Sequence, residues 1–269
     1  MHIDQSTNRR SLWLPAICLT AGIAVVASHA AVAATVLVDP ANMGSWGFYE
    51  DGPAGSSGAG SFVSGPGTPP LGSGSAQLST GDTTSSEVLF NYGTDVGTPL
   101  TDITSLYYQS YVVSSPGSND QSPSLQFNVV KSNSATTYQG RLVFEPYYAS
   151  TITPGSWQAW NALSNGADWW FSNTTVFNAG CSISAPCTWS QVLADYPTVE
   201  INNNYGGFGF KVGSGWTSFV GDVDDFTMGV NSVSTTYNFD PTPTPEPATL
   251  ALLGSGLLGF AAMRRRRGA

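Results

Sequence analysis

The segment Leu106-Tyr-Tyr-Gln-Ser-Tyr-Val-Val113 shows the pattern that decides the fold. Its side chains alternate between two faces, and one face carries Leu106, Tyr108, Ser110 and Val112. A period of two residues is typical of a β-strand. The same alternation returns in residues 125–130, 142–145 and 208–212. In the last of these, bulky side chains alternate with Gly209 and Lys211, so we expect one buried and one open face.

Turn residues separate these alternating segments. Residues 115–120 and 153–155 combine proline and glycine with small polar residues, which favour turns. Many short strands joined by such turns predict an all-β fold, a single antiparallel β-sandwich of jelly-roll or concanavalin-like type. The sandwich is expected to span residues 35–240, with a signal helix before it and a membrane helix after it.

Three segments depart from plain alternation. Residues 189–195 predict one short helix, which Thr188 caps and which ends before Pro197. Val223 lies out of phase with the stripe that follows it, which predicts a bulge near Asp224 and Asp225. Residues 52–75 are mostly small residues and proline, which predicts a long flexible loop.

The N-terminal segment has the three parts of a secretory signal peptide. Arg9 and Arg10 precede an apolar run over residues 12–26, and small residues in an Ala-x-Ala pattern follow. We expect residues 1–34 to form this signal, with cleavage after Ala33 or Ala34. An uncleaved anchor helix is the alternative.

The C-terminal segment begins with a proline-rich spacer over residues 241–247, which ends in Pro245, Glu246 and Pro247. Residues 248–269 follow, with an uncharged apolar stretch from Ala248 to Met263. As a helix this stretch is about 24 Å long, close to the thickness of a bilayer core. The segment ends in a basic cluster, Arg264, Arg265, Arg266 and Arg267, which is expected to stay in the cytoplasm.

This arrangement resembles the PEP-CTERM sorting signal of exported bacterial proteins. The resemblance implies that an exosortase-type membrane enzyme is a partner and cuts near the Pro-Glu-Pro motif. It also implies a membrane-anchored precursor that ends at the cell surface or in the extracellular matrix, near extracellular polysaccharide. An ordinary tail anchor that is never processed is the alternative reading.

The charge of the expected domain limits its partners. The whole chain has 9 basic and 18 acidic residues, but residues 35–240 hold only Lys131, Arg141 and Lys211 against sixteen acidic residues. Their net charge of −13 excludes a phosphate-binding basic face, so nucleic acid is not an expected partner. It also disfavours acidic polysaccharide unless divalent ions bridge the two.

Cys181 and Cys187 are the two cysteines of the expected domain. In an oxidising exported setting they predict a disulfide. A zinc or redox pair is the alternative, but the spacing matches neither.

The histidines His2 and His29 both lie in the expected signal peptide. The domain therefore lacks the base of Ser-His-Asp and Cys-His catalysis and the usual zinc ligand. A carboxylate pair is the remaining catalytic candidate, from Glu145 and Glu200. Without a compact hydrolase motif around them, the sequence predicts a protein that is not an enzyme and has no cofactor.

Two residue groups are candidates for ligand binding. Asp222, Asp224 and Asp225 offer oxygen atoms that could bind calcium, although a solvated strand end or loop in an acidic protein is the favoured explanation. Aromatic side chains could stack on sugar rings, Trp157, Trp169 and Trp170 above all, with Trp160, Trp216, Tyr147 and Tyr148 as further candidates. Core packing is the competing role. Trp169 and Trp170 must point to opposite faces if they lie in a strand.

The sequence from Phe208 to Trp216, with residues 221–226, loosely resembles late strands of concanavalin-like or laminin-G-like sandwiches. This resemblance carries over no functional residue. Together, these patterns predict an exported surface or matrix protein with a structural or adhesive role. A lectin-like carbohydrate-binding module is the alternative, and a polysaccharide hydrolase is a more remote one.

Overall fold

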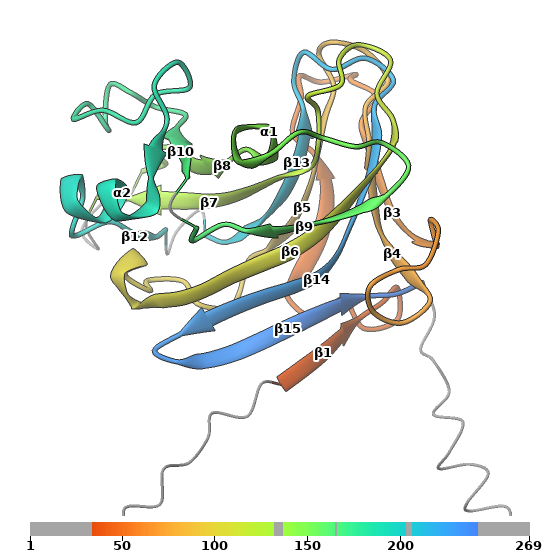
Figure 1. Ribbon diagram of the computed structural model, residues 1–269, viewed down its shortest axis with the longest axis horizontal. Coiled ribbons are helices and arrows are strands. Elements are labelled where there is room, and N and C mark those ends of the chain that lie inside the picture. The colour runs from red at the N-terminus through yellow and green to blue at the C-terminus, as the bar shows by residue number, and fades with distance from the viewer. Residues whose placement is uncertain (1–33, 132–136, 165, 203–205, 242–269) are drawn as a thin grey trace, which may run out of the picture. The chain divides into compact units, whose positions relative to one another are not determined.

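The computed structural model describes residues 34–131, 137–164, 166–202 and 206–241 (Figure 1). Its strands are β1 Ala34–Val38, β2 Trp46–Glu50, β3 Ala59–Ser64, β4 Gly74–Ser79, β5 Ser86–Asn91, β6 Ile103–Ser114, β7 Ser124–Val130, β8 Arg141–Phe144, β9 Trp157–Asn161, β10 Ala167–Phe171, β11 Cys187–Thr188, β12 Glu200–Ile201, β13 Phe208–Gly213, β14 Val220–Val230 and β15 Val233–Phe239. Its helices are η1 Leu100–Asp102, α1 Pro146–Ala149 and α2 Trp189–Asp195. Within these ranges no helix has the length and apolar character needed to cross a membrane. The expected signal peptide, sorting motif and membrane helix fall in residues 1–33 and 242–269, outside the described part.

A seven-stranded sheet forms one layer of the molecule. It is centred on β14, which pairs with β6 along one edge. Along the other edge, β4 pairs with the first part of β14 and β15 with the second part. The outer members are β3 beside β4, β9 beside β6 and β1 beside β15. These pairs are antiparallel except β1 with β15, which run parallel from Ala34–Thr235 to Val38–Phe239.

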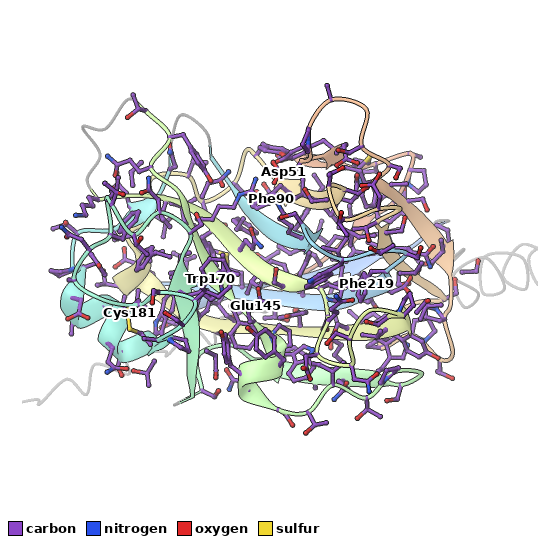
Figure 2. The ribbon with its side chains drawn as sticks, turned by 90° about the horizontal axis from the view of Figure 1, so that it is seen from above. Asp51, Phe90, Glu145, Trp170, Cys181 and Phe219 are labelled. Atoms are coloured by element: carbon purple, nitrogen blue, oxygen red, sulfur yellow. A yellow bond between two sulfur atoms is a disulfide. The ribbon has the colours of Figure 1, made fainter. Side chains whose placement is uncertain are left out.

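An eight-stranded antiparallel sheet forms the second layer, in the order β11, β10, β8, β7, β13, β5 and β2, with β12 also paired to β7. Aromatic rings join the two layers. Trp46 of this sheet lies 5.0 Å from the ring of Phe239 and 6.1 Å from that of Phe226, both in the seven-stranded sheet. The two sheets therefore share one core, as expected for a β-sandwich, and Figure 2 shows how densely side chains fill it.

The predicted alternation decides which side chains enter this core. Phe208, Phe210 and Val212 of β13 are fully buried among the core residues. Leu125 and Phe127 of β7 point the same way. The residues between them point away from the core, to the outer face of the eight-stranded sheet.

The helix and the bulge lie where the sequence predicts them. The Thr188 hydroxyl accepts a hydrogen bond from the backbone N–H of Gln191 at 3.1 Å, and the Gln191 side chain accepts one from the N–H of Thr188 at 2.9 Å. This capping box starts α2, which ends at Asp195. The pairing of β14 with β6 shifts register between Asp224 and Thr227, and Asp225 has a φ of 53°. The four-residue helix α1 was not predicted.

The Cys181–Cys187 disulfide is confirmed, with the two Sγ atoms 2.07 Å apart. It closes the loop that leads into α2.

The expectation of a flexible loop over residues 52–75 is wrong. This segment contains β3, which pairs with β4 from Ala59–Ser79 to Ser64–Gly74. The glycines of this segment allow neighbouring side chains to pack closely against the backbone. A Cβ on Gly60, for example, would lie 2.1 Å from the Phe48 ring. Composition alone suggested a loop, but here the small residues make room for the side chains of β2.

Candidate functional site

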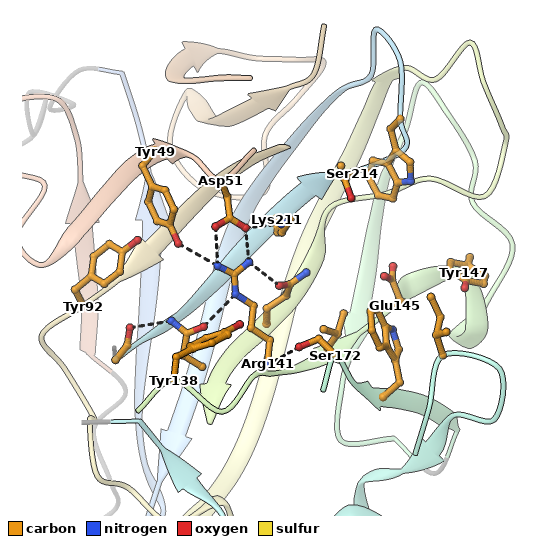
Figure 3. A pocket seen from close by; sticks show the side chains of 18 residues that line it. Tyr49, Asp51, Tyr92, Tyr138, Arg141, Glu145, Tyr147, Ser172, Lys211 and Ser214 are labelled. Atoms are coloured by element: carbon orange, nitrogen blue, oxygen red, sulfur yellow. Dashed lines mark hydrogen bonds and ion pairs between the residues drawn. The ribbon is translucent and has the colours of Figure 1, made fainter. Parts of the chain in front are cut away.

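A pocket of about 960 Å³ opens on the outer face of the eight-stranded sheet (Figure 3). Its volume is at the upper end of the range for small-molecule sites. The strand alternation that buries the core also supplies its floor. Gln126 of β7 pairs with Val143 of β8, which pairs with Trp170 of β10, and all three line the pocket. In the next row, Asn128 pairs with Arg141.

An ion-pair cluster occupies one end of this pocket. Arg141 binds Asp51 through two nitrogens, at 2.8 Å from Nη1 and 3.2 Å from Nη2. Lys211 Nζ also pairs with Asp51. The guanidinium is held further by Asn128, Gln126 and Tyr49. Every N–H of Arg141 that the side chain can offer is directed at a protein partner, so this arginine shapes the pocket floor.

Burial and the neighbouring charges shift the pKa values of Asp51 and Lys211. Burial raises the pKa of Asp51, but Arg141 and Lys211 more than offset this, so its pKa lies below the usual value. Burial lowers the pKa of Lys211, and its contact with Asp51 partly compensates. Two of the three basic residues between positions 35 and 240 thus meet in one pocket of a domain with a net charge of −13.

Exposed apolar side chains form the rim. Tyr92, Tyr138 and Ile183 are 43%, 48% and 54% exposed. They are three of the seven large hydrophobic side chains that are exposed in the described part of the chain, and all three line the pocket. Exposed apolar area gathered around a polar floor is typical of a ligand site.

Glu145 and Trp170 lie at the other end of the pocket, next to Tyr147 (Figures 2 and 3). Glu145 is only 9% exposed, and burial raises its pKa to about 8. Its interaction with the Trp170 indole N–H acts in the opposite direction and lowers the pKa. Neither Glu145 Oε2 nor Trp170 Nε1 makes a hydrogen bond of good geometry with a described residue, although both atoms are buried.

The structure separates the candidate tryptophans. Trp170 and Trp216 line the pocket. Trp169 is fully buried, and its indole N–H donates to the Ala162 carbonyl at 2.8 Å, so it cannot stack on a sugar. The stacking prediction for Trp169 is corrected for this reason.

The remaining aromatic candidates lie apart from Trp170. Trp157 is half-buried outside the pocket and donates to the Pro66 carbonyl at 2.9 Å. Trp160 belongs to the core and donates to Ser110 Oγ. Of the two tyrosines, Tyr147 lines the pocket, while Tyr148 donates to the carbonyl of Ile183.

The aspartates proposed for calcium do not form a ligand set among the described residues. Asp222 is buried and accepts from Ser75 Oγ. Asp224 is buried and accepts from the backbone N–H groups of Leu71 and Phe239. Asp225 accepts from Gln109 Nε2 at 3.0 Å, so all three carboxylates are bound by protein donors.

The structure also does not bring together the two carboxylates that were considered for hydrolysis, Glu145 and Glu200. Glu145 lines the pocket, but Glu200 lies on β12, pairs with Val130 and is not among the lining residues.

Sequence reasoning missed the main polar residues of the pocket, Asp51, Arg141 and Lys211, and the rim residue Tyr92. The sequence did contain an indication of the basic residues, because cations are scarce in this domain and Lys211 lies on the glycine-rich face of its strand. Nothing in the sequence distinguished Asp51, since it is one of sixteen acidic residues in residues 35–240.

Comparison with known families identifies one feature of the chain. Residues 243–267 match the PEP-CTERM protein-sorting motif, including the Pro-Glu-Pro sequence and the terminal arginines. The motif marks the chain as an exported protein of the exosortase sorting system, as the sequence analysis predicted.

No curated protein matches the chain. Among solved structures, it is similar to the family 11 carbohydrate-binding module of the cellulosomal cellulase Lic26A-Cel5E from Clostridium thermocellum. The two are 15% identical with a TM-score of 0.42, and the similarity covers 71% of this chain and 91% of that one.

Proposed function

We propose that this protein is delivered to the cell surface or extracellular matrix and binds a saccharide there, in the pocket of the eight-stranded sheet. Its role is adhesive, since it holds polysaccharide and does not cleave it. The observation that carries the proposal is the pocket itself, in which apolar side chains at the rim surround a floor of amide and charged groups.

Sugar rings need both kinds of surface. Their C–H faces pack on aromatic rings, and their hydroxyl groups need donors and acceptors in fixed positions. Tyr92 offers an exposed ring, while Gln126 and Lys211 add polar groups to the lining of the same pocket. Because Asp51 and Arg141 hold each other through two hydrogen bonds, the floor is rigid before a ligand arrives.

Delivery follows the sorting motif. We propose that an exosortase-type enzyme cuts near Pro245, Glu246 and Pro247, and that the Ala248–Met263 helix with its arginine cluster stays behind in the membrane. The intact mass of protein recovered from the cell surface tests this step. We expect a product that lacks both the signal peptide and the arginines, and one that retains Arg264–Arg267 would reject processing.

Glycan binding tests the function. We expect protein recovered from the cell surface to bind saccharides on a glycan array, and Tyr92→Ala to weaken binding about tenfold, the equivalent of roughly 1.4 kcal/mol for a lost stacking surface. Trp157→Ala is the matched control, because Trp157 is a half-buried aromatic residue outside the pocket. Equal losses from both variants would contradict a role for the pocket.

A further inference from the structure

The buried end of the pocket holds the Glu145 carboxyl group and the Trp170 indole N–H side by side. Glu145 Oε2 and Trp170 Nε1 are both buried without a hydrogen bond of good geometry. Native proteins rarely leave a buried polar atom without a well-formed hydrogen bond. Here both atoms belong to side chains that line the same pocket.

Strand register explains why these two side chains meet. Trp170 pairs with Val143 on β8, and Glu145 follows two residues later on the same face. The Glu145 backbone N–H bonds the Asp168 carbonyl at 3.1 Å, which continues the β8–β10 pairing up to this residue. The backbone hydrogen bonds of this strand pair thus place the Trp170 indole N–H beside the Glu145 carboxyl group.

No cation contributes to the pKa of Glu145. The titratable groups that interact with it are Tyr108 beneath it and Tyr147 on α1. Burial raises the pKa of both phenols, so both stay neutral in the range of interest. Asp120 and Tyr148 interact with Tyr147. Arg141 and Lys211 are committed to Asp51 at the other end of the pocket (Figure 3).

We infer that Glu145 and Trp170 form a subsite that binds the hydroxyl groups of an uncharged sugar ring, with Glu145 acting as a neutral carboxylic acid. This inference rests on the proposed function and deepens it by naming the ligand class. A neutral carboxyl group donates one hydrogen bond and accepts others, and the indole N–H donates one. A pair of adjacent hydroxyl groups can satisfy all of these, whereas a ring that carries a carboxylate would place a negative charge where no cation is available.

Burial by the ligand favours the protonated acid further. A sugar ring over Glu145 removes water from the carboxyl group, and this disfavours its ionised form. The affinity for the sugar should therefore be highest at a pH below the pKa that Glu145 has in the ligand-free protein. It should weaken as the pH rises through that value.

Calorimetric titration at pH 6 and pH 9 tests the inference, with uncharged cello- and xylo-oligosaccharides as probes and oligogalacturonate as the charged probe. With a pKa of about 8, roughly one Glu145 in ten stays protonated at pH 9, so the affinity for the uncharged probe should fall about tenfold from pH 6. Glu145→Gln keeps the shape and hydrogen-bonding capacity of the acid and should bind equally at both pH values. Trp170→Phe should lose about fivefold at pH 6, and the control Trp157→Phe should lose nothing.

Each outcome separates the inference from the proposed function. Binding of an uncharged probe with the same affinity at both pH values, or a fall that persists in Glu145→Gln, overturns the inference and leaves the function standing. A persistent fall would instead implicate Lys211, which the variant retains. Binding of the charged probe alone overturns the inference in the same way. Binding of no probe overturns both.

Discussion

Replacing Asp51 with asparagine would test how far the pocket floor depends on its ion pairs. The substitution keeps the size of the side chain but removes the negative charge that Arg141 and Lys211 share. The side chain of Arg141 is only 10% exposed, so water cannot replace the lost partner well. In addition, the two cations would then repel each other without compensation, an effect that already lowers the pKa of Lys211.

The structure sets the expected magnitude. Removing one partner from a buried ion pair costs about 3–5 kcal/mol. Asp51 is 24% exposed, and asparagine retains one oxygen that can accept from Arg141, so we expect a loss below this range, about 2 kcal/mol in the free energy of unfolding. The loss should be smaller in a Lys211→Met background, because the repulsion between the two cations is then absent.

Urea denaturation followed by tryptophan fluorescence measures this difference. The midpoint should fall while the slope stays unchanged, since the surface exposed on unfolding is the same. Asp120→Asn is the matched control, because Asp120 is exposed and makes no side-chain hydrogen bond within the described residues. Equal midpoints for the two variants would refute the reasoning and show that the cluster is screened by solvent.

Three further predictions concern the rest of the domain. Burial raises the pKa values of Asp222 and Asp224 to about 7, so the folded chain holds protons that the unfolded chain releases near pH 4. The unfolding free energy should therefore fall as the pH rises from about 4 to about 7, and a urea midpoint that rises across this range would contradict it. Reducing the Cys181–Cys187 disulfide should cost roughly 2 kcal/mol from the entropy of its short loop, measured as a lower midpoint with reductant than without. Trp169→Phe should lower the unfolding free energy by about 1–3 kcal/mol, because it leaves the buried Ala162 carbonyl unpaired, whereas Trp157→Phe should cost less than about 1 kcal/mol, a contrast that thermal unfolding of the two variants would reveal.

The sequence predicted what depends on local pattern. The alternation in residues 208–212 identified both the core face and the open face of β13, because side-chain direction in a strand follows position alone. The capping residues of α2 and the bulge at Asp225 are equally local, and both are where the pattern places them.

The pocket depends on contacts between distant segments, and the sequence could not supply these. Asp51 and Lys211 are far apart in the chain, and only the pairing of β2, β5 and β13 brings them together. The adjacent tryptophans show the same limit. Their opposite directions followed from the alternation, but which of the two is buried was decided by the sheet on the other side of the core.

The parallel pairing of β1 with β15 has a consequence for the order of events during translocation. In the export proposed above, β1 would cross the membrane before the rest of the domain, yet its hydrogen-bond partner is the last strand before the sorting motif. This contact closes a loop of about 200 residues, so β1 has no partner until β15 is available to pair with it. The edge of the seven-stranded sheet formed by β1 and β15 is therefore expected to be among the last parts of the domain to fold.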